Sequence, residues 1–372
     1  MSRLRVCSVA AIVGLIAALH APPLAVAQQA VAAINRGVVE VETSGAAGIS
    51  VRIAEDLANL IDDGTTRRVV PVVGKGSLQS LTDLKYLRGV DMAILQTDVL
   101  DYAKEQRLLP GLESSLSYIT RLYNEEFHLL AGPEVKNITE LANKKVNVDV
   151  RGSGTAITAS RLFDALKIPV TVTNDSQEVA LDKLRKGEIA ALAFVAGKPA
   201  PLFMSLKGDG GLHFLAVPFN PAASSAYAPT RLTATDYPGL VTQGRAIETV
   251  AVGSVLVAAD LRQLTERYRN VVNFVDIFFT EFQSLLTPGH HPKWQEVNLA
   301  AELPGWRRYP PADQWLQRNV QVASVPKPDE LKQMFARFID ERRQAMGNPA
   351  MRQQDKDALF QQFRSWQRGQ QQ

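Results

Sequence analysis

The stretch "VDVRGSGTAITASRLFDAL", from Val148 to Leu166, contains the strand, turn and helix pattern from which the fold can be argued. Apolar and charged residues alternate up to Arg151, a Gly-Ser-Gly turn follows, and apolar residues then recur with helical spacing. Such a turn can cradle a phosphate, expose a catalytic serine or hold a carboxylate.

Three motif templates fit neither this turn nor the similar glycine turn at Gly74–Ser77. A P-loop requires Ser or Thr after its Gly-Lys pair, but Gly76 follows Lys75. A dinucleotide-binding turn requires a third glycine at the position of Ile157. In a nucleophile elbow each glycine is separated from the serine by one residue, whereas Ser153 has glycines directly on both sides. The interpretation that remains is an anion site. The free N–H groups of a first helical turn favour an anion, and the hydroxyls of Ser153 and Thr155 can donate to it. The alternative is that Ser153 only caps its own helix.

The first 27 residues have the pattern of a secretory signal peptide. Arg3 and Arg5 precede an apolar run from Val6 to Leu19, and the small-x-small sequence Ala25-Val26-Ala27 ends the segment. The run is shorter than the ~20 residues that span a bilayer, which argues against an uncleaved anchor. We therefore predict cleavage after Ala27 and export to the periplasm.

The charge balance and the cysteine content of the remaining chain exclude several classes. Without Arg3 and Arg5, 39 basic residues face 38 acidic ones, which gives no electrostatic reason to expect a nucleic-acid partner. The single cysteine, Cys7, lies inside the predicted signal peptide, so a mature chain has neither disulfides nor thiol chemistry. The sequence suggests no cofactor.

Strand and helix patterns alternate along the chain, over about 37–125 and again over 131–218. Repeated β-α-β units predict an α/β fold with a mostly parallel sheet. A later strand, Glu248–Asp260, is expected to return across the two units, and an apolar stripe from Leu261 through Leu264 to Leu285 is expected to be core. Residues 288–328 look irregular, and 329–346 predict a terminal helix.

Several polar turns directly follow predicted strands, where open α/β sheets bind ligands. We expect the turns of two facing lobes to meet in one cleft. Lys75 and Lys198 would then attract an acidic ligand, or would be ordinary surface lysines. Tyr123 could line the same cleft or belong to the core. The candidate ligand-binding residues are Ser44, Gly45, Lys75, Gly76, Ser77, Gln96, Thr97, Tyr123, Ser153, Gly154, Thr155, Gly197 and Lys198.

The segments "VVPVVGKGSLQSLTDLKYLRGVDMAILQTDVL", "LYNEEFHLLAG", "KKVNVDVRGSGTAITASRLFDAL" and "LRKGEIAALAFVAGKP" resemble substrate-binding subunits of tripartite ATP-independent periplasmic (TRAP) transporters, in their TAXI branch. The similarity covers roughly residues 35–285. Gly152–Thr155 match the second-lobe motif, and Gly74–Ser77 with Gln96–Asp98 match those of the first lobe. "TSGAAGIS" departs from the family because its turn contains no aromatic residue.

The resemblance implies a type II periplasmic-binding-protein fold, with two α/β lobes, a hinge, and here a partly helical C-terminal extension. It implies a small carboxylate ligand, such as a dicarboxylate, a 2-oxo acid or a glutamate-like amino acid, and an inner-membrane TRAP permease as partner. The expected organisation is a signal peptide (1–27), a first lobe (28–130), a second lobe (131–229), a return to the first lobe (230–287) and an extension (288–372). We expect a monomer that binds and does not catalyse.

Other readings of the sequence remain open. A binding protein of an ABC importer, or the detached domain of a sensor, would share the fold. An exported hydrolase would pair Ser153 with His128 or His290, but no nucleophile–base spacing supports it. His290 and His291 are adjacent and do not form the i, i+4 pair of a helical zinc site, so no metal is expected. Asp98 could belong to the site or cap the following helix, and we favour the structural role.

Overall fold

The computed structural model describes residues 37–46, 48–219, 226–319, 335–336, 351–357 and 359–360. The predicted signal peptide and nearly all of the predicted helix over 329–346 lie outside the described residues. The chain divides into two compact units, Met1–Ala312 and Asp313–Gln372. The first contains every element discussed below except the end of α11 (Pro310–Asn319).

The first lobe is built on three parallel strands. β1 (Val38–Thr43) pairs with β2 (Arg68–Val73) on one side and with β3 (Val90–Gln96) on the other. β2 contains Pro71 and forms the edge of the sheet, where a missing backbone donor is tolerated. The helices of this lobe are α3 (Ser50–Ile61), α4 (Ser77–Tyr86), α5 (Thr97–Glu105), α6 (Leu112–Ser115) and, later in the chain, α10 (Glu266–Thr280).

The second lobe repeats the pattern with three further parallel strands. β5 (Lys145–Asn147) pairs with β6 (Thr171–Thr173) and with β7 (Ala191–Ala196). Its helical segments are η1 (Ile138–Leu141), α7 (Gly154–Leu166), α8 (Gln177–Arg185), α9 (Pro201–Met204) and η2 (Asp209–Gly211).

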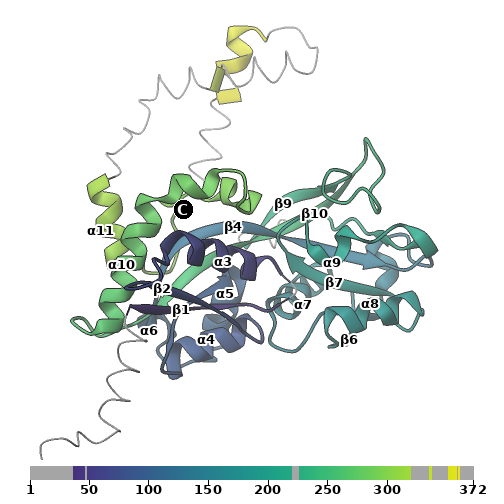
Figure 1. Cartoon of the computed structure of the whole chain (residues 1–372). Coiled ribbons are helices and arrows are strands. Elements are labelled where there is room, and N and C mark those ends of the chain that lie inside the picture. The colour runs from purple at the N-terminus through teal and green to yellow at the C-terminus, as the bar shows by residue number, and fades with distance from the viewer. Residues whose placement is uncertain are drawn as a thin grey trace, which may run out of the picture. The chain divides into compact units, whose positions relative to one another are not determined.

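Two long strands run through both lobes (Figure 1). β4 (Leu116–Ala131) and β10 (Ala246–Ala259) are antiparallel neighbours from Leu116–Ala259 to Glu126–Ala251. One end of β10 pairs with β3 and its other end with β9 (Tyr227–Thr233), while the far end of β4 pairs with β7 and with β8 (His213–Phe214). Two α/β lobes joined by shared strands are the type II periplasmic-binding-protein architecture, as predicted.

Two local expectations differ from the structure. The run Tyr123–Pro133 predicts a strand, whereas β4 begins seven residues earlier, at Leu116. The strand is buried on both faces and therefore lacks a two-residue alternation that would mark its start. Leu264 is 87% exposed, so its assignment to the apolar core stripe was wrong. The helix begins only after the N-cap Thr265, whose side chain accepts a hydrogen bond from the Tyr268 N–H.

Residues 288–309, which follow the predicted lobes, pack on the first lobe. Trp294, in η5 (Pro292–Glu296), is fully buried against Phe278 and Phe282, and the latter lies in η4 (Phe282–Leu286). The Trp294 Nε1–H donates to Asp56 Oδ2 of α3 at 2.9 Å. Residues 288–309 are therefore part of this unit and are not a separate appendage.

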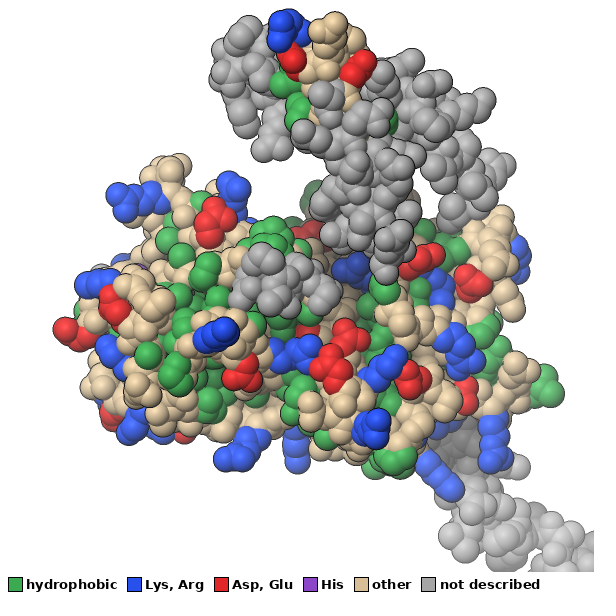
Figure 2. Space-filling model, turned by 180° about the vertical axis from the view of Figure 1, so that it is seen from behind, with side chains coloured by type: hydrophobic (Ala, Val, Ile, Leu, Met, Phe, Trp, Pro, Cys, Tyr) green, Lys and Arg blue, Asp and Glu red, His purple; other side chains and the backbone are tan. Residues whose placement is uncertain are grey.

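The surface carries charges of both signs. Figure 2 shows Lys and Arg side chains interspersed with Asp and Glu across the face that it draws. Among the described residues, no helix has both the length and the apolar character needed to cross a bilayer.

Candidate functional site

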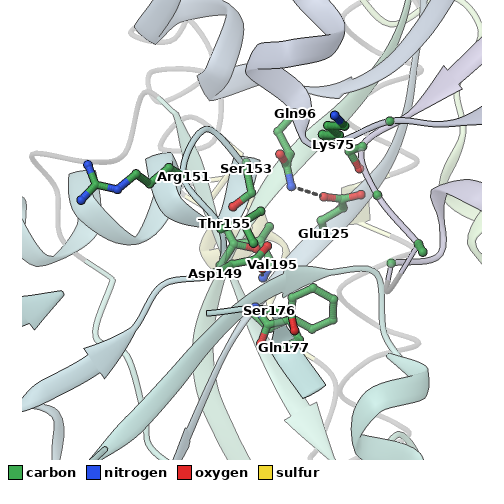
Figure 3. Close-up of a pocket in the computed structure, with 18 of the residues that line it drawn as sticks. Lys75, Gln96, Glu125, Asp149, Arg151, Ser153, Thr155, Ser176, Gln177 and Val195 are labelled. Atoms are coloured by element: carbon green, nitrogen blue, oxygen red, sulfur yellow. Dashed lines mark hydrogen bonds between the residues drawn. The ribbon is translucent and has the colours of Figure 1, made fainter. Parts of the chain in front are cut away.

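A cavity of about 530 Å³ lies between the lobes (Figure 3). This volume falls within the range of small-molecule sites, roughly 300–1,000 Å³. The turns after β1 and β2 and the last residue of β3 line one side of the cavity. The starts of α7 and α8 and the end of β7 line the other side, and the strand β4 contributes Glu125. The cavity is thus placed where the ends of parallel strands from both lobes meet.

The structure brings seven of the candidate residues to this cavity: Ser44, Gly45, Lys75, Gln96, Ser153, Gly154 and Thr155. The remaining six do not line it, although two of them, Gly76 and Ser77, belong to the turn that carries Lys75. The side chains of Lys75 and Arg151 belong to exposed residues at the rim, and Figure 3 shows Arg151 extending away from the other labelled residues.

The other predicted residues serve the structure of the lobes. Lys198 forms an ion pair with Asp236 at 3.3 Å, and its Nζ donates to the Arg231 carbonyl at 2.7 Å. Gly197 packs on Ile49, because a Cβ at this glycine would lie 2.3 Å from Ile49 Cδ1. Thr97 begins α5.

Ser153 and Thr155 both have internal partners. The Ser153 hydroxyl caps α7 by accepting from the Ala156 N–H at 3.1 Å, and its interaction with Asp149 opposes the rise in the Asp149 pKa. The capping role considered from the sequence is therefore the one observed. Thr155 Oγ1 accepts from the buried Val195 N–H at 3.0 Å, and the same hydroxyl can still donate its own proton.

A chain of hydrogen bonds links the first-lobe turn to the shared strand. Ser77 Oγ donates to Gln96 Oε1 at 2.9 Å, and Gln96 Nε2 donates to Glu125 Oε2 at 2.6 Å. Tyr123, 1% exposed, lies behind this chain, with its hydroxyl 3.3 Å from Glu125 Oε1. Gly154 of the second lobe packs on the same amide, because a Cβ there would lie 1.2 Å from Gln96 Oε1.

Three carboxylates line the cavity and were not among the sequence candidates: Glu125, Asp149 and the exposed Glu178. Burial raises the pKa of Glu125 to about 7, against the opposing effect of hydrogen bonds from Gln96 and Tyr123. Burial also raises the pKa of Asp149, which lies directly before the turn and has φ 70°. The available signal was the acidic pair Glu125-Glu126 inside an apolar strand, since acids in buried strands are rare.

Lys293 forms ion pairs with two acids that lie outside the cavity, Glu126 and Glu296. Lys293 Nζ lies 2.7 Å from Glu126 Oε1 and 2.7 Å from Glu296 Oε1, and Lys293 and Glu126 are both buried. Burial raises the pKa of Glu126, and the charge of Lys293 opposes that shift. Lys293 thus compensates a charge on the shared strand next to Glu125.

The lobes are in contact beside the cavity. Asp98 Oδ2 accepts from Thr158 Oγ1 of α7 at 2.7 Å and from the Tyr227 hydroxyl at 2.9 Å, and burial raises the Asp98 pKa to about 6. Ile157 of α7 packs into the apolar cluster of the first lobe. The structure therefore gives Asp98 a structural role at the lobe interface. The particular role considered from the sequence, capping of α5, is wrong, because the N-cap is Gln96 and no side chain caps this helix.

Neither histidine of the hydrolase hypothesis lines the cavity. His128 is fully buried, with Nδ1 3.2 Å from the Phe194 carbonyl and Nε2 2.7 Å from the Tyr237 hydroxyl, and burial lowers its pKa to about 3. His290 lies 3.4 Å from Asp56 on the first lobe. Within the described part of the chain, no group of three or more His, Cys, Asp or Glu residues is arranged to hold a metal ion.

A larger cavity, of about 830 Å³, lies at the opposite ends of the second-lobe strands. Its polar lining comes from exposed or half-exposed side chains such as Lys144, Arg185 and Glu188, and it includes no sequence candidate. We take the cavity between the lobes as the functional site because both lobes and the shared strand β4 contribute to it.

Solved structures with a similar fold include "Structure of a periplasmic transporter" (12% identity, TM-score 0.46, covering 76% of this chain and 92% of that one). Another is the periplasmic binding protein BugD (11% identity, TM-score 0.45, covering 70% of this chain and 88% of that one). A third is the substrate-binding protein of an amino acid ABC transporter (14% identity, TM-score 0.40, covering 69% of this chain and 96% of that one). Residues 41–269, more than half of the sequence, match the NMT1-like family. They include most of both lobes and every residue that lines the cavity, and the chain belongs to the NMT1-like family.

Proposed function

We propose that this protein is an extracytoplasmic solute-binding protein of the TAXI type, which captures a small organic acid or amino acid and delivers it to a TRAP permease. The observation that carries the proposal is the cavity of about 530 Å³ between the lobes, which segments of both lobes line. A ligand that contacts both lobes binds the closed arrangement better than an open one, so that capture and closure are coupled.

The lining also supports an acidic group on the ligand. The N-terminus of α7 faces the cavity with Gly154 and Thr155, and Lys75 lies at the rim. First-turn N–H groups and a nearby cation favour a carboxylate. The chain then acts as a periplasmic receptor and, we propose, as a monomer.

A ligand screen tests the proposal. The chain without residues 1–27 is heated with dicarboxylates, 2-oxo acids and amino acids, and its unfolding is followed by fluorescence. A compound at 100 times its Kd is expected to stabilise the protein by about 2.7 kcal/mol. If no member of the three classes shifts the transition, the proposed ligand class is wrong.

The transporter partner needs a separate test. A neighbouring gene for a large multi-span permease without an ATPase would agree with TRAP delivery, whereas a neighbouring ATPase would favour an ABC importer. Burst release of product from ester or amide substrates would instead favour the hydrolase hypothesis.

A further inference from the structure

The buried charge in the cavity between the lobes is negative. Glu125 is 4% exposed and Asp149 is half-buried, whereas the two basic lining residues, Lys75 and Arg151, are exposed. Within the described residues, neither Glu125 nor Asp149 forms an ion pair with Lys, Arg or His. A buried carboxylate that lacks a cation is costly unless a partner neutralises it.

A third acceptor of the cavity lacks a donor. Gln177 is 2% exposed, and its Nε2 donates to the Ala193 carbonyl at 3.1 Å. Because a carbonyl can only accept, this contact fixes the orientation of the amide and turns Oε1 the other way. Gln177 Oε1 has no hydrogen-bond partner, and the residue lines the cavity. An unmet buried acceptor destabilises the fold, and a donor on the ligand would offset that cost.

The nearest buried lysine, Lys293, does not form an ion pair with Glu125, although its charge lowers the Glu125 pKa and so opposes the effect of burial. Lys293 Nζ is already 2.7 Å from both Glu126 and Glu296, so one cation serves two acids before Glu125 is counted. Glu125 instead accepts from two neutral donors, the Gln96 amide and the Tyr123 hydroxyl. The shared strand therefore presents excess negative charge to the cavity.

We propose that the cavity binds a ligand with a protonated nitrogen beside its carboxylate, and that Glu125, Asp149 and Gln177 Oε1 receive this nitrogen. An ammonium group has three N–H donors and one positive charge, and the three groups supply acceptors and two negative charges. Asp149 and Gln177 come from the second lobe and Glu125 from the shared strand, so the nitrogen also joins the lobes. The inference rests on the proposed function and narrows its ligand to amino acids, in place of dicarboxylates and 2-oxo acids.

Matched compounds that differ only at this nitrogen give the direct test. Calorimetry compares L-glutamate with 2-oxoglutarate, L-alanine with pyruvate, and L-leucine with 4-methyl-2-oxopentanoate. In any pair that binds, the amino compound is expected to bind at least tenfold more tightly. Equal or tighter binding of the oxo acid would overturn the inference and leave the proposed function intact. Absence of binding by every amino and oxo acid tested would overturn both.

A metal ion offers a competing explanation for the two carboxylates. Each titration is therefore repeated with EDTA and with added Ca²⁺. Unchanged affinity supports a nitrogen subsite. A carboxylate that binds only when Ca²⁺ is present would show that the acids hold a cation of another kind, and would overturn the inference.

Two isosteric variants separate the subsite from general effects on folding. Glu125→Gln and Asp149→Asn are each expected to lower the affinity for the amino compound at least tenfold. The affinity for the matching oxo acid should fall less, so the selectivity between the two compounds is reduced. Removing a buried charge should leave the ligand-free melting temperature unchanged or higher. Glu188→Gln makes the same change of charge at an exposed position of the second lobe, outside the cavity, and serves as the control. Unchanged selectivity in both cavity variants would contradict the assignment.

The pH dependence gives the sign of the interaction. Burial raises the Glu125 pKa to about 7. Its charged or titratable neighbours are Tyr123, Glu126 and Lys293, and the same cavity also contains Lys75, Asp149, Arg151 and Glu178. An ammonium ion requires the ionised carboxylate, so the affinity of an amino compound should fall as the pH is lowered from 8 to 6. A rise over that interval would mean that Glu125 donates its proton to the ligand, and would overturn the inference.

Discussion

The turns at Gly74–Ser77 and Gly152–Thr155 have similar sequences but different roles. Each follows a strand, contains glycine and a hydroxyl residue, and leads into a helix. In the second turn, Ser153 caps its own helix. In the first, the N-cap is Gly76, no side chain caps α4, and Ser77 donates to Gln96.

The two turns also contact each other. The Leu78 N–H donates to the Gly152 carbonyl at 3.2 Å, and a Cβ on Gly76 would lie 2.9 Å from Ser153 Cα. Glycine is thus needed where two backbones approach closely. Similar turns in the two lobes do not form two equal halves of a carboxylate clamp, since part of each is used for contact between the lobes.

The largest effect is expected from Gly154→Ala. A Cβ at this position would lie 1.2 Å from Gln96 Oε1, so either Gln96 must break its bonds to Ser77 and Glu125 or the lobes must separate. Overpacking of this severity costs about 3 kcal/mol or more, at the upper end of measured values. We expect a larger radius of gyration in small-angle X-ray scattering and a lower melting temperature.

The backbone at Gly154 provides a control on this interpretation. Gly154 has no positive φ and begins α7, where alanine is the better helix former. Gly154→Ala should therefore be harmless once the facing side chain is shortened. In the Gln96→Ala background, the additional effect of Gly154→Ala on unfolding should fall below about 0.5 kcal/mol, as for independent sites. An equally large effect in both backgrounds would refute the proposed collision.

The sequence predicts the α/β class, the two lobes, the returning strand and seven of the cavity residues, because each depends on local patterns. Strand periodicity and glycine turns mark the ends of the strands, and the topology of α/β sheets brings those ends together. Tyr123, Gly197 and Lys198 have the same local patterns, but tertiary partners such as Asp236 and Ile49 direct them elsewhere.

The acids of the cavity could not be located from local patterns alone. Glu125 and Glu126 are adjacent, so their side chains project to opposite faces of β4. Which of them faces the cavity depends on the pairing of β4 with β10 and β7, and Lys293, which pairs with Glu126, comes from 167 residues further along the chain. Long-range register and the capture of a distant lysine are properties of the folded chain.

A smaller effect is expected from Asp98→Asn, and it depends on pH. The folded-state pKa of about 6 lies above the ordinary value of 3.8, mainly because of burial, so Asp98 stabilises the fold when protonated and loses that contribution as the pH rises from about 4 to 6. Asparagine does not titrate and can still accept from Thr158 and Tyr227. The free energy of unfolding of Asp98→Asn, relative to the unsubstituted protein, should increase by roughly 2 kcal/mol between pH 4 and pH 7.

The measurement is urea unfolding of both proteins at each pH. Because the other acids titrate equally in the two chains, their contributions cancel in the difference. A constant difference for Asp98→Asn would mean that this carboxylate has an ordinary pKa at the lobe interface.

The smallest effect is expected from alanine substitutions of Ser153 and Ser176, two serines at equivalent positions. Comparing the two variants distinguishes helix capping from contact with the ligand. Ser153 and Ser176 are the N-caps of α7 and α8, and both line the cavity, but only Ser153 makes a side-chain capping bond. Ser153→Ala should destabilise the protein by about 1 kcal/mol, and Ser176→Ala by much less. Thermal unfolding without ligand checks this difference, and equal losses would contradict the capping role. Because Ser153 interacts with Asp149 and lowers its pKa, its removal should alter ligand affinity chiefly through that carboxylate. A loss of affinity at Ser176 without loss of stability would therefore identify a direct contact with the ligand.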